Sequence, residues 1–448
     1  MSSKSLRNHR GCYQMLSEML MRCNATKAVL RLTLLALVCA SIYMLAHILS
    51  PRFGGVVVCH LRPSSYASSS SSSSLSFGMV QGEDDDDDDE EEEQYPLIDP
   101  WPENWLRINR SRVVVAGHSN AADFAHQVHI AYSSLVNGAC IFAGQPFHCA
   151  VQRFEEDPLV EAGSFERESY NVPNCPDCPR GKALVYDHCK NMPHVIDVGM
   201  LPDYPRRICG PDGKPGCLDG VDNLRKPNQR VYLQRGTMDK CYRKGSVAAV
   251  EGLYAQLLDH PSKQILFNNT IPLHHTIPHE GNEVAPSYDG PRECFKHTFF
   301  EDADDDDLQP KAGIFEDHKY RFTQHRFGGF DPLVGTNKFG WLYVPSACIN
   351  KSETCGLFVY FRPCGGGSGV NDANLDEFDT WAENNRIVIL NPVVGKNKCF
   401  LKYRGCTEVA RGCWDGYGQL GSDYALQSGK HMMFAGNILK GFLDAYGV

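Results

Sequence analysis

A serine within a predicted sharp turn is the residue best placed to do chemistry. Residues 113–121 read Val-Val-Val-Ala-Gly-His-Ser-Asn-Ala, which predicts a strand, a turn and the start of a helix. Such an elbow can project the poorly nucleophilic Ser119 hydroxyl and aim a backbone N–H at an oxyanion. Gly117 supplies the small residue needed before the serine, whereas Ala121 stands where the G-x-S-x-G pattern has glycine. An ordinary strand–helix turn is therefore the alternative.

An acid and a base follow the serine along the chain. Asp239 comes shortly after the apolar run 230–233, and His274 and His275 follow the next run, 264–268. In a parallel sheet the carboxyl ends of the strands meet at one edge, so these side chains would converge there. A lone aspartate after a strand is more often a helix cap or a turn residue, and a lone histidine is more often a surface or a packed residue. Their joint order predicts a Ser-His-Asp triad.

Strands and helices that alternate along the chain would bring these candidate site residues together. Apolar runs predict strands at 112–116, 139–143, 230–233, 264–268, 339–344, 357–361 and 386–390. Helical spacing predicts helices over 120–133 and 247–258, and most of 420–446. The pattern predicts an α/β fold with a mostly parallel sheet flanked by helices. Two stretches with little periodicity, near 150–217 and 278–317, are interpreted as insertions.

The cysteine content indicates an oxidising compartment. Of 19 cysteines, 15 lie between positions 140 and 413, a density that favours disulfides. Cys348 and Cys355 bracket a short loop between two apolar runs and form the best candidate pair. A zinc site is the less favoured alternative for the loop cysteines; it would use Cys175, Cys178, His188 and Cys189.

The N-terminal part is expected to anchor the protein in a membrane. Residues 32–49 contain no charged side chain and are long enough to cross a bilayer as a helix. Six basic residues and one acid precede them, which predicts a cytosolic tail at 1–31 and a signal-anchor helix at 32–50. A cleaved signal peptide and a buried soluble helix are the alternatives. Glycosylation sequons at Asn109, Asn268 and Asn350 are consistent with a lumenal or extracellular domain.

A low-complexity stalk is predicted over 51–95. Residues 64–74 are almost all serine, and residues 83–93 are an unbroken run of 11 acids. Neither can bury apolar surface, so both are expected to be disordered. The acidic run is interpreted as a solvated spacer rather than as a site for cations or a basic partner. It accounts for the formal net charge of −10, and the nearly neutral remainder gives no indication of nucleic-acid binding.

Several segments resemble the extracellular polyhydroxybutyrate depolymerases. Residues 117–133 resemble the nucleophile segment of that family, 141–149 the next strand and its exit loop, 236–239 the acid motif and 275–278 the His-x-x-Pro segment. C-terminal matches lie at 340–348, 355–365, 381–394 and 412–418. The resemblance covers about 105–448 apart from the two insertions. In an ordinary α/β-hydrolase the oxyanion-loop strand precedes the nucleophile. Here it follows, as in the circularly permuted branch of the family.

The resemblance implies a role for each matching residue. Ser119 would be the nucleophile, His275 the base and Asp239 the residue that orients the imidazole. It selects His275 over His274 and His279 because only His275 has proline, Pro278, three residues later. The implied oxyanion donors are the backbone N–H groups of Asn120 and Cys364, and the implied cleft residues are Trp414 and Tyr417. The chain departs from the family by having Arg362-Pro363 before Cys364, where His-Gly is usual.

The expected protein is thus a membrane-anchored serine hydrolase whose catalytic domain spans 96–448. It would cleave ester bonds of poly- or oligo-hydroxyalkanoates, or related small esters, without a metal or cofactor. Two alternatives remain: a catalytically silent hydrolase-like binding module, and an esterase of another class, such as one acting on feruloyl or acetylxylan esters. The sequence does not indicate an oligomeric state.

Overall fold

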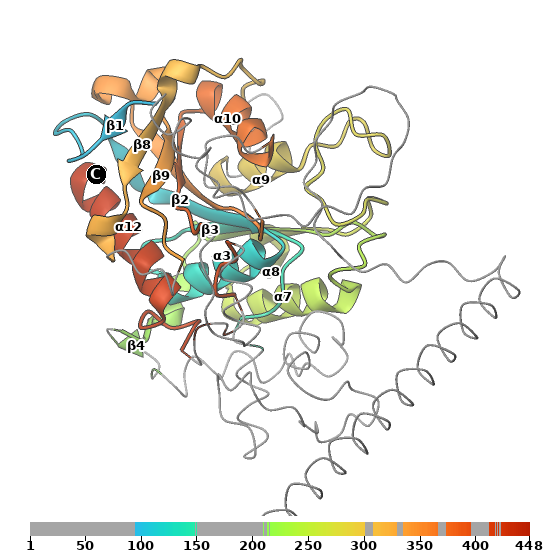
Figure 1. Cartoon of the computed structure of the whole chain (residues 1–448). Helices are drawn as coiled ribbons and strands as arrows, with labels where there is room; N and C mark the ends of the chain where they lie inside the picture. The colour runs from blue at the N-terminus through green and yellow to red at the C-terminus, as the bar shows by residue number, and fades with distance from the viewer. Residues whose placement is uncertain are drawn as a thin grey trace, which may run out of the picture. The chain divides into compact units, whose positions relative to one another are not determined.

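A nine-stranded sheet is the centre of the computed structural model (Figure 1). The structure describes residues 95–147, 149, 209, 213–214, 216–300, 308–328, 335–365, 373–395, 412–416, 418, 420 and 423–448. Within these, the strand order is β1-β8-β9-β11-β10-β2-β3-β6-β7. The strands are β1 (Leu97–Ile98), β2 (Ile108–His118), β3 (Gly138–Phe142), β6 (Arg230–Gln234), β7 (Ile265–Asn268), β8 (Lys319–Thr323), β9 (Phe339–Tyr343), β10 (Cys355–Phe361) and β11 (Ile387–Asn391). A separate hairpin pairs β4 (Gly213–Lys214) with β5 (Leu218–Asp219).

Helices follow several of the strands. The α-helices are α3 (Asn120–Ala131), α7 (Lys244–Leu257), α8 (Pro261–Gln264), α9 (Gly290–Phe299), α10 (Ala373–Asn385) and α12 (Lys430–Tyr446). Short 3-10 helices are η2 (Val221–Arg225), η3 (Glu316–His318), η4 (His325–Phe327) and η5 (Ser346–Lys351). The α/β class predicted from the alternating pattern is confirmed, and so is the mostly parallel sheet. The antiparallel exception is β9, which runs opposite to both β8 and β11.

Side-chain alternation along the strands fills two apolar layers. On β2, Val113 and Val115 belong to one core cluster, and Val114 and Ala116 belong to the other. This follows from the period of two in a strand that is buried on both faces. Helices α3, α7 and α12 contribute to the first cluster, and α9 and α10 contribute to the second. Figure 1 shows α9 and α10 on one side of the sheet, with α3 and α7 on the other.

The stretch 278–317 is not simply an irregular insertion. It contains α9, whose Phe295 and Phe299 pack in the core on the second face of the sheet. Asp289 caps this helix by accepting a hydrogen bond from the Arg292 N–H, and Pro291 lies in its first turn. The low average hydrophobicity of the segment conceals one apolar face. The predicted helix over 420–446 is also shorter than expected, because α12 begins only at Lys430.

The expected parts of the N-terminal region lie outside the described residues. These parts are the tail at 1–31, the signal-anchor helix at 32–50 and almost all of the stalk at 51–95. The alternative zinc ligands between 175 and 189 also lie outside. In the described ranges, no helix is both long and apolar enough to cross a membrane.

Candidate active site

Ser119 stands at a strained turn between β2 and α3. Its backbone has φ 62° and ψ −130°, a left-handed conformation that a side chain rarely adopts. The turn is held by a hydrogen bond of 2.9 Å from the Ser119 N–H to the Phe142 carbonyl on neighbouring β3. A Cβ at Gly117 would lie 2.2 Å from the carbonyl oxygen of Ala121. Glycine is therefore required before the serine, while alanine is accommodated at 121. This geometry is that of a nucleophile elbow.

Asp239 and His275 lie side by side, beyond the carboxyl ends of β6 and β7. The Nδ1 atom of His275 is 2.9 Å from Oδ2 of Asp239. The other carboxylate oxygen accepts hydrogen bonds from the backbone N–H groups of Cys241, at 2.7 Å, and Tyr242, at 3.0 Å. Burial would raise the pKa of Asp239, but the bonds from His275 and these two N–H groups outweigh it and lower the pKa. The carboxylate thus remains charged and fixes the orientation of the imidazole.

The neighbouring histidines occupy different environments. His274 is exposed, and His279 places its Nε2 atom 3.1 Å from Oδ1 of Asn374. His275 is the histidine that contacts Asp239, and its side chain keeps 13% of its surface exposed. Its ring also lies 4.5 Å, between centroids, from the ring of His118, which directly precedes the serine. The Asp239–His275 pair therefore lies next to the turn at Ser119.

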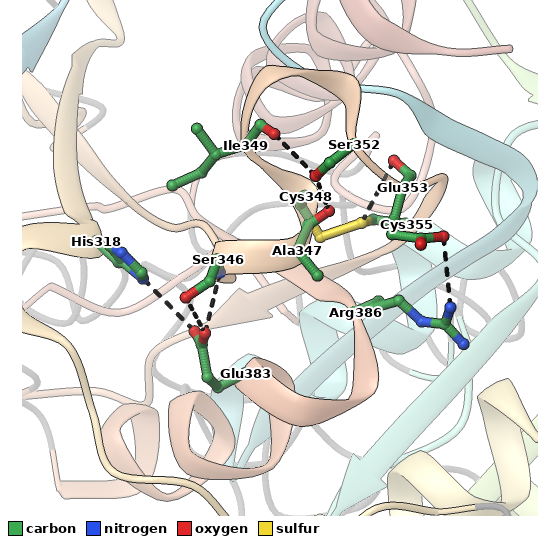
Figure 2. The surroundings of a disulfide bond; sticks show 10 residues. All are labelled: His318, Ser346, Ala347, Cys348, Ile349, Ser352, Glu353, Cys355, Glu383 and Arg386. Atoms are coloured by element: carbon green, nitrogen blue, oxygen red, sulfur yellow. Dashed lines mark hydrogen bonds and ion pairs between the residues drawn. A yellow bond between two sulfur atoms is a disulfide. The ribbon is translucent and has the colours of Figure 1, made fainter.

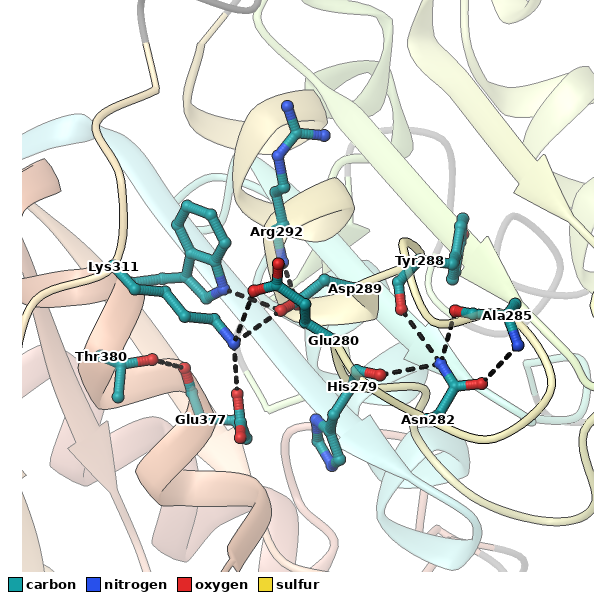
Figure 3. Close-up of polar contacts among 11 residues, drawn as sticks. His279, Glu280, Asn282, Ala285, Tyr288, Asp289, Arg292, Lys311, Glu377 and Thr380 are labelled. Carbon is teal, nitrogen blue, oxygen red and sulfur yellow. Dashed lines mark hydrogen bonds and ion pairs between the residues drawn. The ribbon is translucent and has the colours of Figure 1, made fainter.

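The loop after His275 is fastened to the start of α9. The Pro278 carbonyl accepts a hydrogen bond of 2.7 Å from the Gly290 N–H. Next to it, Asp289 forms an ion pair of 2.8 Å with Lys311, and Figure 3 shows this lysine reaching both Asp289 and a carboxylate on α10. The bond between Pro278 and Gly290 joins the segment that follows His275 directly to the start of α9.

The two expected oxyanion donors lie on adjacent strand ends. Strand β10 is the parallel neighbour of β2, with Phe361 opposite Gly117, although the two strands lie far apart in the sequence. Cys364 follows three residues after Phe361 and is bonded to Cys413. Asn120 is the first residue of α3, where a helix N–H has no intrahelical acceptor. Both backbone groups are therefore at the same edge of the sheet as Ser119.

Trp414 differs from its expected place in a substrate cleft. Its side chain is 0% exposed and stacks on Phe124 of α3, with ring centroids 4.5 Å apart. It also meets Phe361 of β10 edge-on at 4.9 Å. Trp414 therefore packs in the core behind the site and does not line an open cleft. The other expected cleft residue, Tyr417, lies outside the described residues.

A cation site at the acid–base pair can be tested on its donor atoms. Ligand atoms of Asp239, Cys241 and His275 lie within 4.8 Å of one another. Cys241 is disulfide-bonded, so it offers no thiolate, and the Nδ1 atom of His275 already faces Asp239. The three residues do not fit a resident metal ion.

The expected Cys348–Cys355 disulfide is present (Figure 2). It closes the loop next to Glu383, whose carboxylate accepts hydrogen bonds from the Ser346 backbone N–H, at 3.0 Å, and hydroxyl, at 2.5 Å. Sequence reasoning did not pair the other bridged cysteines, because the cysteines are distant or embedded in irregular segments. Further pairs include Cys140–Cys294, Cys209–Cys217 and Cys364–Cys413, and Cys149 and Cys241 are also disulfide-bonded.

Comparisons with known proteins find similarity to PHB depolymerases. No protein-family model matches the chain. A poly(3-hydroxybutyrate) depolymerase of Delftia acidovorans is 26% identical over 348 residues, covering 73% of this chain. The chain spans only 58% of that relative's length. A polyhydroxybutyrate depolymerase of Talaromyces funiculosus is 23% identical over 343 residues, covering 70% of this chain and 85% of the relative.

Solved structures of depolymerases share the fold. The PHB depolymerase from Penicillium funiculosum superimposes with a TM-score of 0.55 at 19% identity, covering 76% of this chain and 98% of that one. A serine-to-alanine variant of a PHB depolymerase, complexed with an R3HB trimer, gives a TM-score of 0.57 at 18% identity and the same coverage. The resemblance to PHB depolymerases predicted from the motifs is therefore confirmed.

Proposed function

We propose that this chain is a serine hydrolase that cleaves ester bonds of poly- or oligo-hydroxyalkanoates. The observation that carries the proposal is the strained elbow at Ser119 with the hydrogen-bonded Asp239–His275 pair beside it. The depolymerase relatives support a polyester substrate, and the complex of one structural neighbour holds a hydroxybutyrate trimer. The reaction needs no metal or cofactor.

The triad residues have distinct roles in the proposed mechanism. His275 takes the proton of the Ser119 hydroxyl as the oxygen attacks the ester carbonyl, and then gives that proton to the leaving alcohol. Asp239 keeps the Nδ1–H tautomer in place and stabilises the imidazolium. Water, activated by the same histidine, then hydrolyses the acyl-enzyme and frees the serine.

The oxyanion of each tetrahedral intermediate needs two N–H donors aimed at one point. In the proposal, these are the backbone amides of Asn120 and Cys364. The strand pairing of β10 with β2 supports this assignment, because it places both amides beyond neighbouring strand ends. The proposal includes a circularly permuted α/β-hydrolase order, in which the oxyanion strand follows the nucleophile strand in the sequence.

Covalent labelling tests the nucleophile directly. A fluorophosphonate probe should label the full chain at Ser119, and Ser119→Ala should abolish both labelling and hydrolysis. The matched control is Ser262→Ala, which changes an exposed serine on α8 and should behave like the wild type. No labelling of the folded wild type would favour a silent binding module. Labelled protein that hydrolyses feruloyl or acetylxylan esters but not a hydroxybutyrate polymer would reassign the substrate.

The proposal also places the catalytic domain outside the cytosol, held by the segment at 32–50. The several disulfides support an oxidising compartment. The full chain should remain in the membrane pellet after carbonate extraction, and the catalytic domain should resist protease added to intact vesicles. Release into the supernatant would contradict the anchor.

A further inference from the structure

Tyr242 contacts both members of the acid–base pair. Its ring lies nearly parallel to that of His275, with centroids 5.5 Å apart and an angle of 10° between the planes. Its backbone N–H donates the 3.0 Å hydrogen bond to Asp239. One residue therefore supports the face of the imidazole and also satisfies the carboxylate that orients it.

The hydroxyl of Tyr242 extends this contact to the nucleophile helix. It donates a hydrogen bond of 2.6 Å to Oδ2 of Asp123, which lies four residues after Ser119 in the first turn of α3. Oδ1 of Asp123 accepts a second bond of 2.8 Å, from the Gln145 N–H. A buried carboxylate is stable only when its oxygens receive donors. The hydroxyl thus connects the loop that carries Asp239 to α3, the helix that follows Ser119.

Tyr242 is itself held in place. It is buried, with 1% of its surface exposed. The Nε atom of Arg235 donates to the Tyr242 carbonyl at 2.7 Å, and a second guanidinium nitrogen donates to the Asp239 carbonyl at 2.7 Å. Tyr242 is thus fixed through its backbone, its ring face and its hydroxyl. It can therefore hold His275, Asp239 and Asp123 at constant distances from one another.

We infer that Tyr242 is a positioning residue that sets the mutual geometry of Ser119, His275 and Asp239. The inference rests on the proposed function. It assigns to this tyrosine the task of keeping the base and the nucleophile at reacting distance, since a displacement of about 1 Å can lower a rate about 100-fold.

The decisive comparison is between two buried tyrosines. Tyr242→Phe removes the hydroxyl that bonds Asp123, and Tyr254→Phe removes one that lies 2.7 Å from Nδ1 of His129, away from the triad. Both variants keep the ring and lose one buried hydrogen bond. In the full chain, we expect kcat of Tyr242→Phe to fall about tenfold with little change in KM. Tyr242→Leu, which also loses the stacked ring, should fall about 100-fold. Tyr254→Phe should keep the wild-type kcat.

A proton resonance gives a readout that does not depend on turnover. The His275 Nδ1–H that faces Asp239 should appear far downfield in the proton NMR spectrum. It should shift or broaden in Tyr242→Phe and stay unchanged in Tyr254→Phe. Equal kcat in wild type and Tyr242→Phe, or equal resonances in the two phenylalanine variants, would overturn the inference. If the wild type hydrolyses no ester, the proposed function fails, and the resonance still decides whether Tyr242 positions the pair.

Discussion

Moderate acid should destabilise the fold through two buried histidines on α3. His126 and His129 are each 0% exposed. Burial lowers the pKa of His126 to about 3 and that of His129 to about 4. In the unfolded chain both would titrate near the ordinary value of about 6.5. Their contribution to stability is therefore complete above about pH 6.5 and is lost progressively as the pH falls towards these folded-state values.

The magnitude follows from this difference in pKa. At pH 5, protonation of an unfolded-state histidine with a pKa of about 6.5 stabilises the unfolded chain by about 2 kcal/mol, while the folded state gains almost nothing. His118, whose pKa burial also lowers, adds to this loss. Asp379 acts in the opposite direction, because burial raises its pKa and the folded state takes up its proton first. Comparing the wild type with a variant that lacks one of these histidines isolates the contribution of that histidine to the pH dependence, because all other titrating groups are present in both proteins.

Urea unfolding at pH 7.5 and pH 5 provides the assay. His129→Gln should lower the overall stability, because the imidazole lies 2.7 Å from the Tyr254 hydroxyl and 2.8 Å from Oε1 of Gln229. Its loss of unfolding free energy between the two pH values should nevertheless be about 2 kcal/mol smaller than that of the wild type. The exposed His260 is the control, and His260→Gln should show the full wild-type loss. An equal pH-dependent loss in His129→Gln and the wild type would refute this reasoning.

Three further predictions concern the elbow, the acid and the oxyanion loop. Gly117→Ala should remove activity and destabilise the protein by several kcal/mol in chemical unfolding, whereas Gly313→Ala, whose new methyl meets nothing within 4 Å, should do neither. Asp239→Asn should lower kcat by about 10⁴-fold with a modest change in KM, and a loss below tenfold in steady-state kinetics would show that another group orients the base. Replacing both Cys364 and Cys413 with serine should lower kcat by about 10²-fold, measured on a soluble ester, because one oxyanion donor is no longer fixed; an unchanged kcat would remove the Cys364 N–H from the mechanism.

The centre of the site could be predicted from sequence because local pattern and chemistry coincide there. The run ending in Gly117 and Ser119 combines β-branched residues with a glycine before the serine, a pattern that predicts an elbow but also fits an ordinary strand–helix turn. Asp239 and His275 could be placed because parallel strands end at a common edge. The choice among three histidines depended on family resemblance, since periodicity does not distinguish adjacent loop residues.

What could not be predicted depends on contacts between distant segments. Helix α9 has an apolar face of only a few residues among charges and a proline, and its place in the core follows from the sheet it covers. The cleft position expected for Trp414 was implied only by the family resemblance. Its burial depends on Phe124 and Phe361, which meet it only in the folded state. Tyr242 belongs to none of the motifs found in the sequence, and its contacts are with Asp123, Asp239 and His275, which lie in three separate segments.

The position of β2 between β3 and β10 also has a consequence for how the chain is made. Strand β3 follows β2 closely in the sequence and can pair with it early, but β10 is synthesised about 240 residues later. At about 5–20 residues per second, one edge of the nucleophile strand would wait for roughly 12–50 seconds before its partner emerges from the ribosome. An exposed apolar strand edge of this kind pairs readily with other chains. One edge of β2 therefore stays exposed to such pairing until β10 has been made, and the turn at Ser119 gains its second neighbouring strand only late in translation.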